Sequence, residues 1–307
     1  YYMIIPYLTQ VNSPFFKKDN TGLGNVLFQI FTAYGLSKKF NHIFNNYFLI
    51  ELIDKLNNFN LNHSSTIFRN LKISKTTDKE GIVLNEKNDY YSLYDTDLIN
   101  ELKKMNNNSI IILNGYFQSH LYFDEYYNDI IKLISPDKNS LNYIKIKYNH
   151  LFDNDIINIS IHFRINWGQN LQYNYNYYND SIEYIINILK SKNIQKKILL
   201  NIFGDDINQI KKIFKSTKYE CIYYEGNPDY IDLWCMSLCN FNIISHSTLS
   251  WWGAYLNVNK DKIVIYPEDI LRLFKATIHA KPILPERKIQ HYKSDWIALK
   301  TKNVIFQ

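Results

Sequence analysis

Cysteine is scarce in this sequence, and the three that occur are Cys221, Cys235 and Cys239. Their odd number and their spacing match neither a disulfide framework nor a metal-binding pattern. Cys235 and Cys239 lie one helical turn apart, so we expect them to be core residues of a helix. We therefore expect a reducing compartment, either the cytoplasm or the cytoplasmic face of a membrane.

Long apolar runs and blocks of basic residues are also missing. No run reaches the roughly 20 residues of a transmembrane helix, and no signal-peptide pattern occurs, so we expect membrane association only through parts outside this chain. Because the chain begins at Tyr1 rather than at Met, we expect a processed form or one part of a longer protein. The net charge of +6 is spread along the chain, which indicates no nucleic-acid partner but suits a small anionic substrate such as a nucleotide sugar.

Several enzyme classes lack their sequence signatures. There is no Ser-His-Asp order, no Cys nucleophile with a base partner and no metal-ligand spacing, so hydrolases and metalloenzymes are disfavoured and no metal or other cofactor is expected. The glycine pair Gly22 and Gly24 is not a dinucleotide fingerprint, because Leu27 stands at the third glycine position and a long loop precedes it. The two glycines either permit a tight turn or let a ligand approach the backbone.

What the sequence does contain is enough apolar material for two domains: 307 residues, of which 46% are hydrophobic. In the first half, apolar patterns predict strands at 2–8, 82–84 and 110–113 and helices at 26–40 and 138–149. The polar run Asp153-Asn154-Asp155 is a break between apolar segments. We therefore predict an N-terminal α/β domain at 1–153 and a C-terminal domain at 154–307, whose last segment is free to pack back on the first.

The second half alternates regularly between strand and helix patterns. Strands are expected at 156–162, 198–203, 220–224, 241–244 and 262–266, with helices between them. This order is typical of a parallel sheet covered on both faces, which binds its ligands at the carboxyl ends of the strands. Three polar clusters fall at such ends, and these clusters are His162 with Arg164, Asp205 with Asp206, and the turn from Ser245 through His246 and Ser247 to Thr248.

Each cluster has a structural and a functional interpretation. His162 and Arg164 are two apart on an extended segment and point the same way, so they either face one ligand or form a core histidine and a structural ion pair. An arginine fork suits a diphosphate because it binds bidentately and stays charged. Asp205 and Asp206 either cap a helix or accept hydrogen bonds from a base or ribose hydroxyl.

The turn at 245–248 joins an apolar strand to an aromatic helical segment. Its hydroxyls and the free N–H groups of the helix start are what a phosphate site requires, although Ser and Thr are also ordinary helix caps. Gln118 and Ser119 follow the strand at 110–113, where they either contact substrate or begin a helix.

Several segments also match, in chain order, the motifs of one known family. They are Gly22-Leu23-Gly24-Asn25 with Phe28-Gln29; Gly115-Tyr116-Phe117-Gln118-Ser119 with Tyr122-Phe123; His162-Phe163-Arg164; Phe203-Gly204-Asp205-Asp206; and Asp232-Leu233 through Ser245-His246-Ser247-Thr248-Leu249-Ser250-Trp251-Trp252-Gly253-Ala254. On these motifs the chain resembles the α-1,2-fucosyltransferases, glycosyltransferase family eleven. The last block is the most specific, and the resemblance spans roughly residues 1 to 270.

The resemblance implies a GT-B-like α/β fold with two Rossmann-like domains facing a cleft. It implies an inverting, metal-independent transfer of fucose from GDP-fucose to a hydroxyl of an acceptor glycan, as an α-1,2 linkage to galactose or a similar sugar. The site residues that it implies are, for catalysis, Arg164 and His162; for the donor, Arg164, Gly24, Asn25, Asp205, Asp206, His246, Ser247 and Thr248; and for the acceptor, Gln118 and Ser119.

One departure from the family pattern bears on the substrate. The family continues His-x-Arg with a second Arg and then Gly-Asp-Tyr, whereas this chain continues with Ile165-Asn166-Trp167-Gly168. His246 also replaces the more usual Asn. Two alternatives therefore stay open, namely the same fold with another deoxyhexose nucleotide donor and a catalytically inactive glycan-binding homologue.

Overall fold

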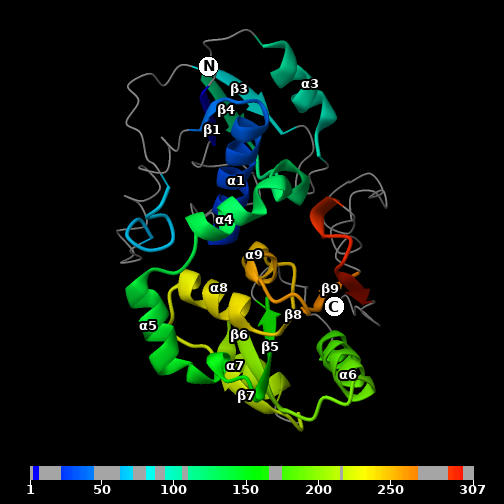
Figure 1. Ribbon diagram of the computed structural model, residues 1–307. Helices are drawn as coiled ribbons and strands as arrows, with labels where there is room; N and C mark the ends of the chain where they lie inside the picture. Colours follow the sequence, from blue (N-terminus) through cyan, green and yellow to red (C-terminus); the bar gives the residue numbers. More distant parts are fainter. Residues whose placement is uncertain are drawn as a thin grey trace. The chain divides into compact units, whose positions relative to one another are not determined.

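A computed structural model describes residues 3–6, 22–44, 63–71, 81–86, 94–105, 110–165, 175–214, 217–268 and 290–299. The chain divides into two compact units. The first unit is Tyr1–Asp137 with Leu284–Ser294, and the second unit is Lys138–Ile283 with Asp295–Gln307. Each unit is built on a parallel sheet of its own (Figure 1).

The first unit has a four-stranded sheet in the order β2-β1-β4-β3. Its strands are β1 (Met3–Pro6), β2 (Ile43–Phe44), β3 (Ile82–Asn85) and β4 (Ile110–Asn114). Helix α1 (Leu23–Lys39) packs on β1 and is buried over most of its length, which explains why its sequence is apolar on nearly every side. The other elements of this unit are α3 (Thr96–Lys104), η1 (His120–Tyr122), η2 (Asp124–Tyr126) and α4 (Tyr127–Leu133).

The second unit has a six-stranded parallel sheet in the order β10-β9-β8-β5-β6-β7. Its strands are β5 (Ile156–Phe163), β6 (Lys197–Gly204), β7 (Glu220–Tyr223), β8 (Phe241–Ile243), β9 (Val264–Pro267) and β10 (Ile297–Leu299). Its helices are α5 (Lys138–Lys147), η3 (Asn149–Phe152), α6 (Tyr175–Ser191), α7 (Ile207–Ile213), α8 (Asp229–Leu238) and α9 (Thr248–Leu256).

The strand order reverses at β5. The chain first runs from β5 outward to β6 and β7, then returns to place β8, β9 and β10 on the other side of β5. In open parallel sheets such a reversal leaves a crevice at the carboxyl ends of the two strands involved, and ligands bind there. The reversal in the second unit therefore lies between the ends of β5 and β8.

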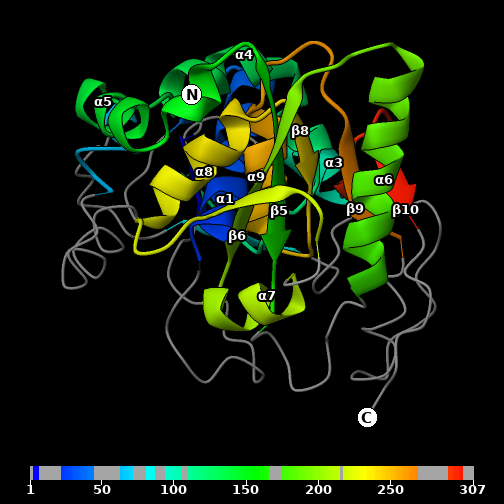
Figure 2. The ribbon, with the colours of Figure 1, turned by 90° about the horizontal axis from the view of Figure 1, so that it is seen from below.

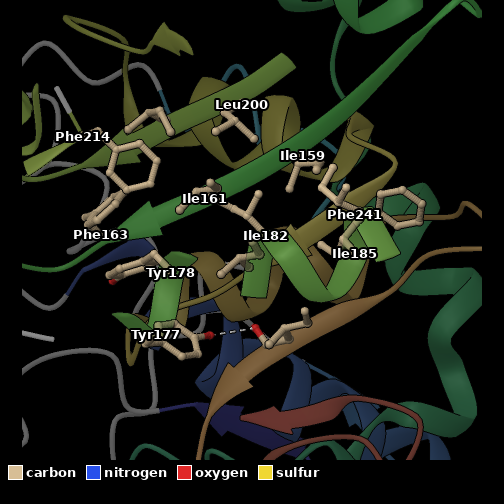
Figure 3. Packing of buried hydrophobic residues seen from close by; sticks show 14 of the residues in the cluster. Ile159, Ile161, Phe163, Tyr177, Tyr178, Ile182, Ile185, Leu200, Phe214 and Phe241 are labelled. Carbon is tan, nitrogen blue, oxygen red and sulfur yellow. Dashed lines mark hydrogen bonds between the residues drawn. The ribbon is translucent and has the colours of Figure 1, made fainter. Parts of the chain in front are cut away.

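One face of the second sheet is apolar. Ile159, Ile161 and Phe163 of β5 pack against α6 and against Phe214 after α7 (Figure 3). Because side chains alternate along a strand, the residues between them face the opposite way, toward α8 and α9. Helices α8 and α9 lie side by side (Figure 2), and Gly253 permits their close approach, since a Cβ there would lie 2.7 Å from Met236 Cβ.

The opposite face is buried but polar. This polar face consists of Asn158, Ser160, His162, Asn201 and Asn242, all at most 6% exposed. Ser160 is paired in register with Asn201 on β6 and with Asn242 on β8, so polar side chains form a row across three strands. Such a row is stable only when its hydrogen bonds are made.

The hydrogen bonds of Asn242 show how this face is satisfied. Its Nδ2 donates to Ser160 Oγ at 2.7 Å and to the Met236 carbonyl of α8 at 2.8 Å, while its Oδ1 accepts from Asn257 Nδ2 at 2.8 Å. The amide thereby joins β5, β8, α8 and the end of α9. The hydrogen bonds of the polar face therefore connect the sheet specifically to the helices that cover it.

The structure confirms the expected α/β class of a GT-B-like fold, with a parallel sheet in each unit. Residues 138–153, which we predict from the sequence to lie in the first domain, belong to the second unit, because α5 packs on α8 and Asn158 Nδ2 donates to the His150 carbonyl of η3. The last segment divides, with Leu284–Ser294 in the first unit and β10 in the second. Cys235 and Cys239 are core residues as expected, and burial raises the pKa of both thiols.

Candidate active site

The reversal of strand order in the second unit is bridged by a side-chain contact. His162, near the end of β5, lies with its Nδ1 2.8 Å from Oγ of Ser245, which follows β8. The same Oγ accepts from the Ser247 N–H at 3.3 Å. The turn at 245–248 is therefore tied to the end of β5, as the prediction of ligands at converging strand ends requires.

His162 is neutral in this position. It is 6% exposed, and burial, with the nearby Arg164 charge as a second cause, lowers its pKa to about 3. Above that pH the His162 ring is hydrogen-bonded to Ser245 but carries no charge. Its geometry suits holding the turn rather than compensating charge on a substrate.

Arg164 extends from the same strand end and meets Asp205 after β6. Its guanidinium NH1 lies 3.4 Å from Asp205 Oδ2, while Asp205 Oδ1 accepts from the Ile165 N–H at 2.8 Å. The Arg164 side chain is 41% exposed, so this ion pair contributes only about 0–1 kcal/mol to stability. The contact instead orients the guanidinium fork of a half-exposed arginine, a group suited to bidentate binding of an anion.

The remaining predicted site residues of the second unit lie at the starts of two helices. Asp206 caps α7 by accepting from the Gln209 N–H at 3.0 Å, as its structural interpretation predicts. Ser247 is the N-cap residue of α9, and Thr248 is that helix's first residue. His246 and Ser247 are partly buried in the turn between β8 and α9. The amide groups of the first turn of α9 lie directly after the turn that His162 holds.

Two buried tyrosines that the sequence did not single out secure both strand ends. Tyr177 of α6 donates its hydroxyl to the carbonyls of Ile244, at 2.8 Å, and Ile265, at 3.1 Å. Its neighbour Tyr178 donates to the His162 carbonyl at 3.3 Å, and both rings lie on the apolar face (Figure 3). Among 26 tyrosines in the chain, no sequence signal distinguishes this pair.

The other predicted site residues lie in the first unit. Asn25, in the first turn of α1 next to Gly24, accepts from Gln118 Nε2 at 3.1 Å. Ser119 is fully buried and donates to the Gln290 carbonyl at 2.8 Å. The structure thus brings Asn25 and Gln118 together, and it brings His162, Arg164, Asp205 and the turn at 245–248 together in the second unit. The departure at Asn166-Trp167-Gly168 lies outside the described residues.

Two kinds of feature are absent from the described part of the chain. No cluster of three or more His, Cys, Asp or Glu side chains there has the arrangement of a metal site. Within the same residues, no helix combines the length and the apolar character needed to cross a bilayer.

Comparison with known proteins identifies the family. The model of glycosyl transferase family 11 matches residues 73–300, which is most of the chain. The chain belongs to glycosyl transferase family 11. It is therefore a glycosyltransferase, and the resemblance drawn from its motifs is confirmed.

Family 11 relatives from Escherichia coli are similar over much of the sequence. The chain is 27% identical to the O-antigen biosynthesis glycosyltransferase WbnK over 80% of its own length and 91% of that protein. It is 29% identical to an alpha-1,2-colitosyltransferase over 50% of its own length and 53% of that protein.

A solved structure of an Arabidopsis thaliana FUT1 mutant in complex with GDP is similar at 10% identity, with a TM-score of 0.49, over 86% of this chain and 70% of that one.

Proposed function

We propose that this family 11 glycosyltransferase transfers fucose from GDP-fucose to a hydroxyl of an acceptor glycan, with an α-1,2 linkage to galactose or a similar sugar. The observation that carries the proposal is the His162–Ser245 contact at the strand-order reversal. It joins the end of β5, where Arg164 emerges, to the turn that begins α9. A guanidinium and a helix start at one crevice are suited to a diphosphate.

The chemistry follows from this placement. The acceptor oxygen forms a bond to the anomeric carbon of the sugar as the bond from that carbon to the diphosphate breaks, which inverts the configuration. The diphosphate leaves with the electron pair, and the acceptor proton passes to solvent. Arg164 and the first amides of α9 would stabilise the negative charge on the leaving diphosphate. We infer no metal ion in this step.

A second donor is supported by a specific comparison. One relative is named an alpha-1,2-colitosyltransferase, and colitose, like fucose, is a deoxyhexose. The chain also departs from the family pattern after Arg164, at Ile165. The alternative is therefore the same transfer with a different deoxyhexose nucleotide.

Ligand-dependent stabilisation tests the donor. We expect GDP and GDP-sugars to raise the melting temperature of the protein, because a ligand that binds only the folded state stabilises it, whereas UDP and dTDP and their sugars should leave it unchanged. Stabilisation by UDP or dTDP compounds alone would overturn the choice of GDP.

Turnover tests the transfer itself. GDP release from GDP-fucose should depend on an added galactoside, for which lactose is the probe, and should persist in EDTA. If GDP-fucose binds but no glycan in a panel stimulates release, the proposed transfer is overturned in favour of a catalytically inactive homologue. Strict dependence on a divalent ion would contradict the metal-free step.

A further inference from the structure

The loop that carries Gln118 contains a strained residue. Phe117 has a φ of 50°, a left-handed conformation that a bulky side chain rarely adopts, and its ring is 1% exposed. Conformations of this kind are unfavourable and persist only where the surroundings enforce them, often where a loop positions a substrate. Gln118 directly follows Phe117, so the strained backbone of Phe117 sets the position of Gln118.

Two polar side chains hold the strained turn in place through hydrogen bonds to its backbone. The Glu86 carboxylate accepts from the Tyr116 N–H at 2.8 Å and from the Phe117 N–H at 3.1 Å. Gln29 of α1 donates from Nε2 to the Gly115 carbonyl at 2.9 Å. The loop is therefore held by its backbone on the side of the sheet.

The loop lies where the first sheet reverses its strand order. In the order β2-β1-β4-β3, the chain goes from β1 to β2 on one side, then crosses to β3 at the opposite edge, and then enters β4, which lies between β3 and β1. Gln118 follows β4 and Asn25 follows β1, and their side chains meet at 3.1 Å. This pair occupies the position in the first unit that is expected to bind a ligand.

A segment that contains His291 contacts both elements that carry this pair. His291 Nδ1 lies 2.7 Å from the Gln118 carbonyl, and because a carbonyl only accepts, Nδ1 carries the proton. The His291 ring stacks on Phe28, one turn of α1 beyond Asn25, with ring centroids 6.0 Å apart and planes 26° apart. His291 thus contacts both elements from which the Asn25–Gln118 pair is built.

The adjacent residue anchors the segment. The Gln290 carbonyl accepts from Ser119 Oγ at 2.8 Å and from His120 Nδ1 at 3.2 Å, and its side-chain Oε1 accepts from the Tyr94 N–H. Lys293 further pairs with Asp124 at 2.7 Å. A short segment bonded at this many points is rigid enough to hold a substrate-facing amide in place.

We propose that His291 is a positioning residue for the acceptor: its Nδ1–H and its ring fix Gln118 and Asn25 so that the Gln118 amide is presented to the acceptor sugar. This rests on the proposed function, since it assumes that Gln118 faces the acceptor. His291 itself touches no substrate, and it acts through the backbone of Gln118 and the ring of Phe28.

Two substitutions separate the hydrogen bond of His291 to Gln118 from its stack on Phe28. His291→Phe keeps the stack on Phe28 but removes the donor, and His291→Asn keeps a donor at the place of Nδ1 but removes the ring. The matched control is His42→Phe, because His42 stacks on Phe40 with the same centroid distance of 6.0 Å and the same interplanar angle of 26° at the other end of α1.

With lactose as acceptor and GDP-fucose as donor, His291→Phe should raise the KM for lactose about tenfold, the factor that a hydrogen bond of about 1.4 kcal/mol sets. The KM for GDP-fucose and kcat should stay within about twofold. His291→Asn should recover most of the loss, and His42→Phe should leave all three constants unchanged. An unchanged KM for lactose in His291→Phe, or an equal rise in both KM values, would overturn the proposal.

Hydrogen exchange tests the contact without any substrate. In His291→Phe, amides of residues 115–122 should exchange about tenfold faster than in the parent protein, while those of 245–256 stay unchanged. Unchanged exchange at 115–122 overturns the positioning role, whatever the protein transfers. Faster exchange together with a protein that uses no galactoside overturns the acceptor assignment and the proposed function, but leaves the contact between His291 and Gln118 intact.

Discussion

At the scale of single residues, the two arginines within the described residues have different surroundings. Arg69 donates to the carbonyls of Thr66, Ser135 and Pro136, so its guanidinium joins two backbone segments of the first unit. Arg164 makes one long contact with Asp205 and stays 41% exposed. Arg69 is therefore structural, whereas Arg164 has the exposure that a substrate-binding arginine needs.

This contrast gives a prediction for Arg164. Arg164→Ala should lower kcat/KM at least a hundredfold and abolish stabilisation by GDP, because the charge facing the diphosphate is lost. Its melting temperature without ligand should change by no more than about 2 °C, since a half-exposed ion pair contributes about 0–1 kcal/mol. Steady-state kinetics and thermal unfolding measure both quantities.

Two controls sharpen the comparison. Arg164→Lys should recover only part of the activity, because an ammonium keeps the charge but not the bidentate fork. Arg69→Ala should lower the melting temperature while GDP still stabilises the protein. Full activity in Arg164→Ala would remove this residue from the donor site.

At the scale of strands and helices, the second unit depends on its polar face. Replacing Asn242 by the similarly sized Leu removes its hydrogen bonds to Ser160 Oγ, to the Met236 carbonyl and to Asn257 Nδ2. We expect a loss of about 3 kcal/mol in the free energy of unfolding, since each buried polar group left unpaired costs about 1–3 kcal/mol. Denaturant titration followed by tryptophan fluorescence measures the loss.

Asn187→Leu, on the exposed side of α6, is the matched control and should change the free energy by no more than about 0.5 kcal/mol. Equal effects at both positions would mean that the polar face contributes no specific stability.

The elements also show what a sequence can and cannot reveal. The strands at 156–162 and 198–203 were predictable because they are apolar runs bounded by turns, and β5 and β6 match them closely. The order of the strands was not, because it depends on pairing between segments far apart in the chain. The sequence predicts that the polar clusters converge, but only the strand order shows which of them are neighbours.

Other parts of the site were hidden for a physical reason. Tyr177, Glu86 and His291 form hydrogen bonds with backbone carbonyls and N–H groups, which nearly all residue types have, so their partners cannot be recognised in the sequence. Asn158 and Asn201 do not stand out in the sequence either, because asparagine occurs throughout this chain. Alternation of apolar and polar residues does not by itself distinguish a solvated face from a buried one whose hydrogen bonds are made.

At the scale of the whole molecule, two titratable groups of the second unit have opposite effects on stability. Burial raises the pKa of Asp232 to about 7, so between about pH 4 and 7 the folded state binds a proton there that the unfolded state does not. Burial lowers the pKa of His162 to about 3, so between about pH 4 and 6.5 the unfolded state binds a proton that the folded state does not. The two effects cancel between about pH 4 and 6.5.

We therefore expect the unfolding free energy of the second unit to be nearly flat between pH 4.5 and 6.5. In Asp232→Asn only the His162 effect remains, and stability should fall by about 1.4 kcal/mol for each pH unit as the pH decreases. All five tryptophans belong to the second unit, so their fluorescence reports its unfolding. Parallel pH profiles for the parent and the variant would contradict this assignment.

The divided last segment governs how the gene could be dissected. A fragment ending at residue 137 would lack Gln290, the partner of Ser119 and Tyr94, and a fragment covering 138–283 would lack β10, which pairs with β9. The second fragment would display the open edge of β9, a template on which other chains assemble. We therefore expect the two fragments to precipitate when each is expressed alone. A version of 138–283 with 295–307 fused to its C-terminus would keep β10 and therefore keep the edge of β9 paired.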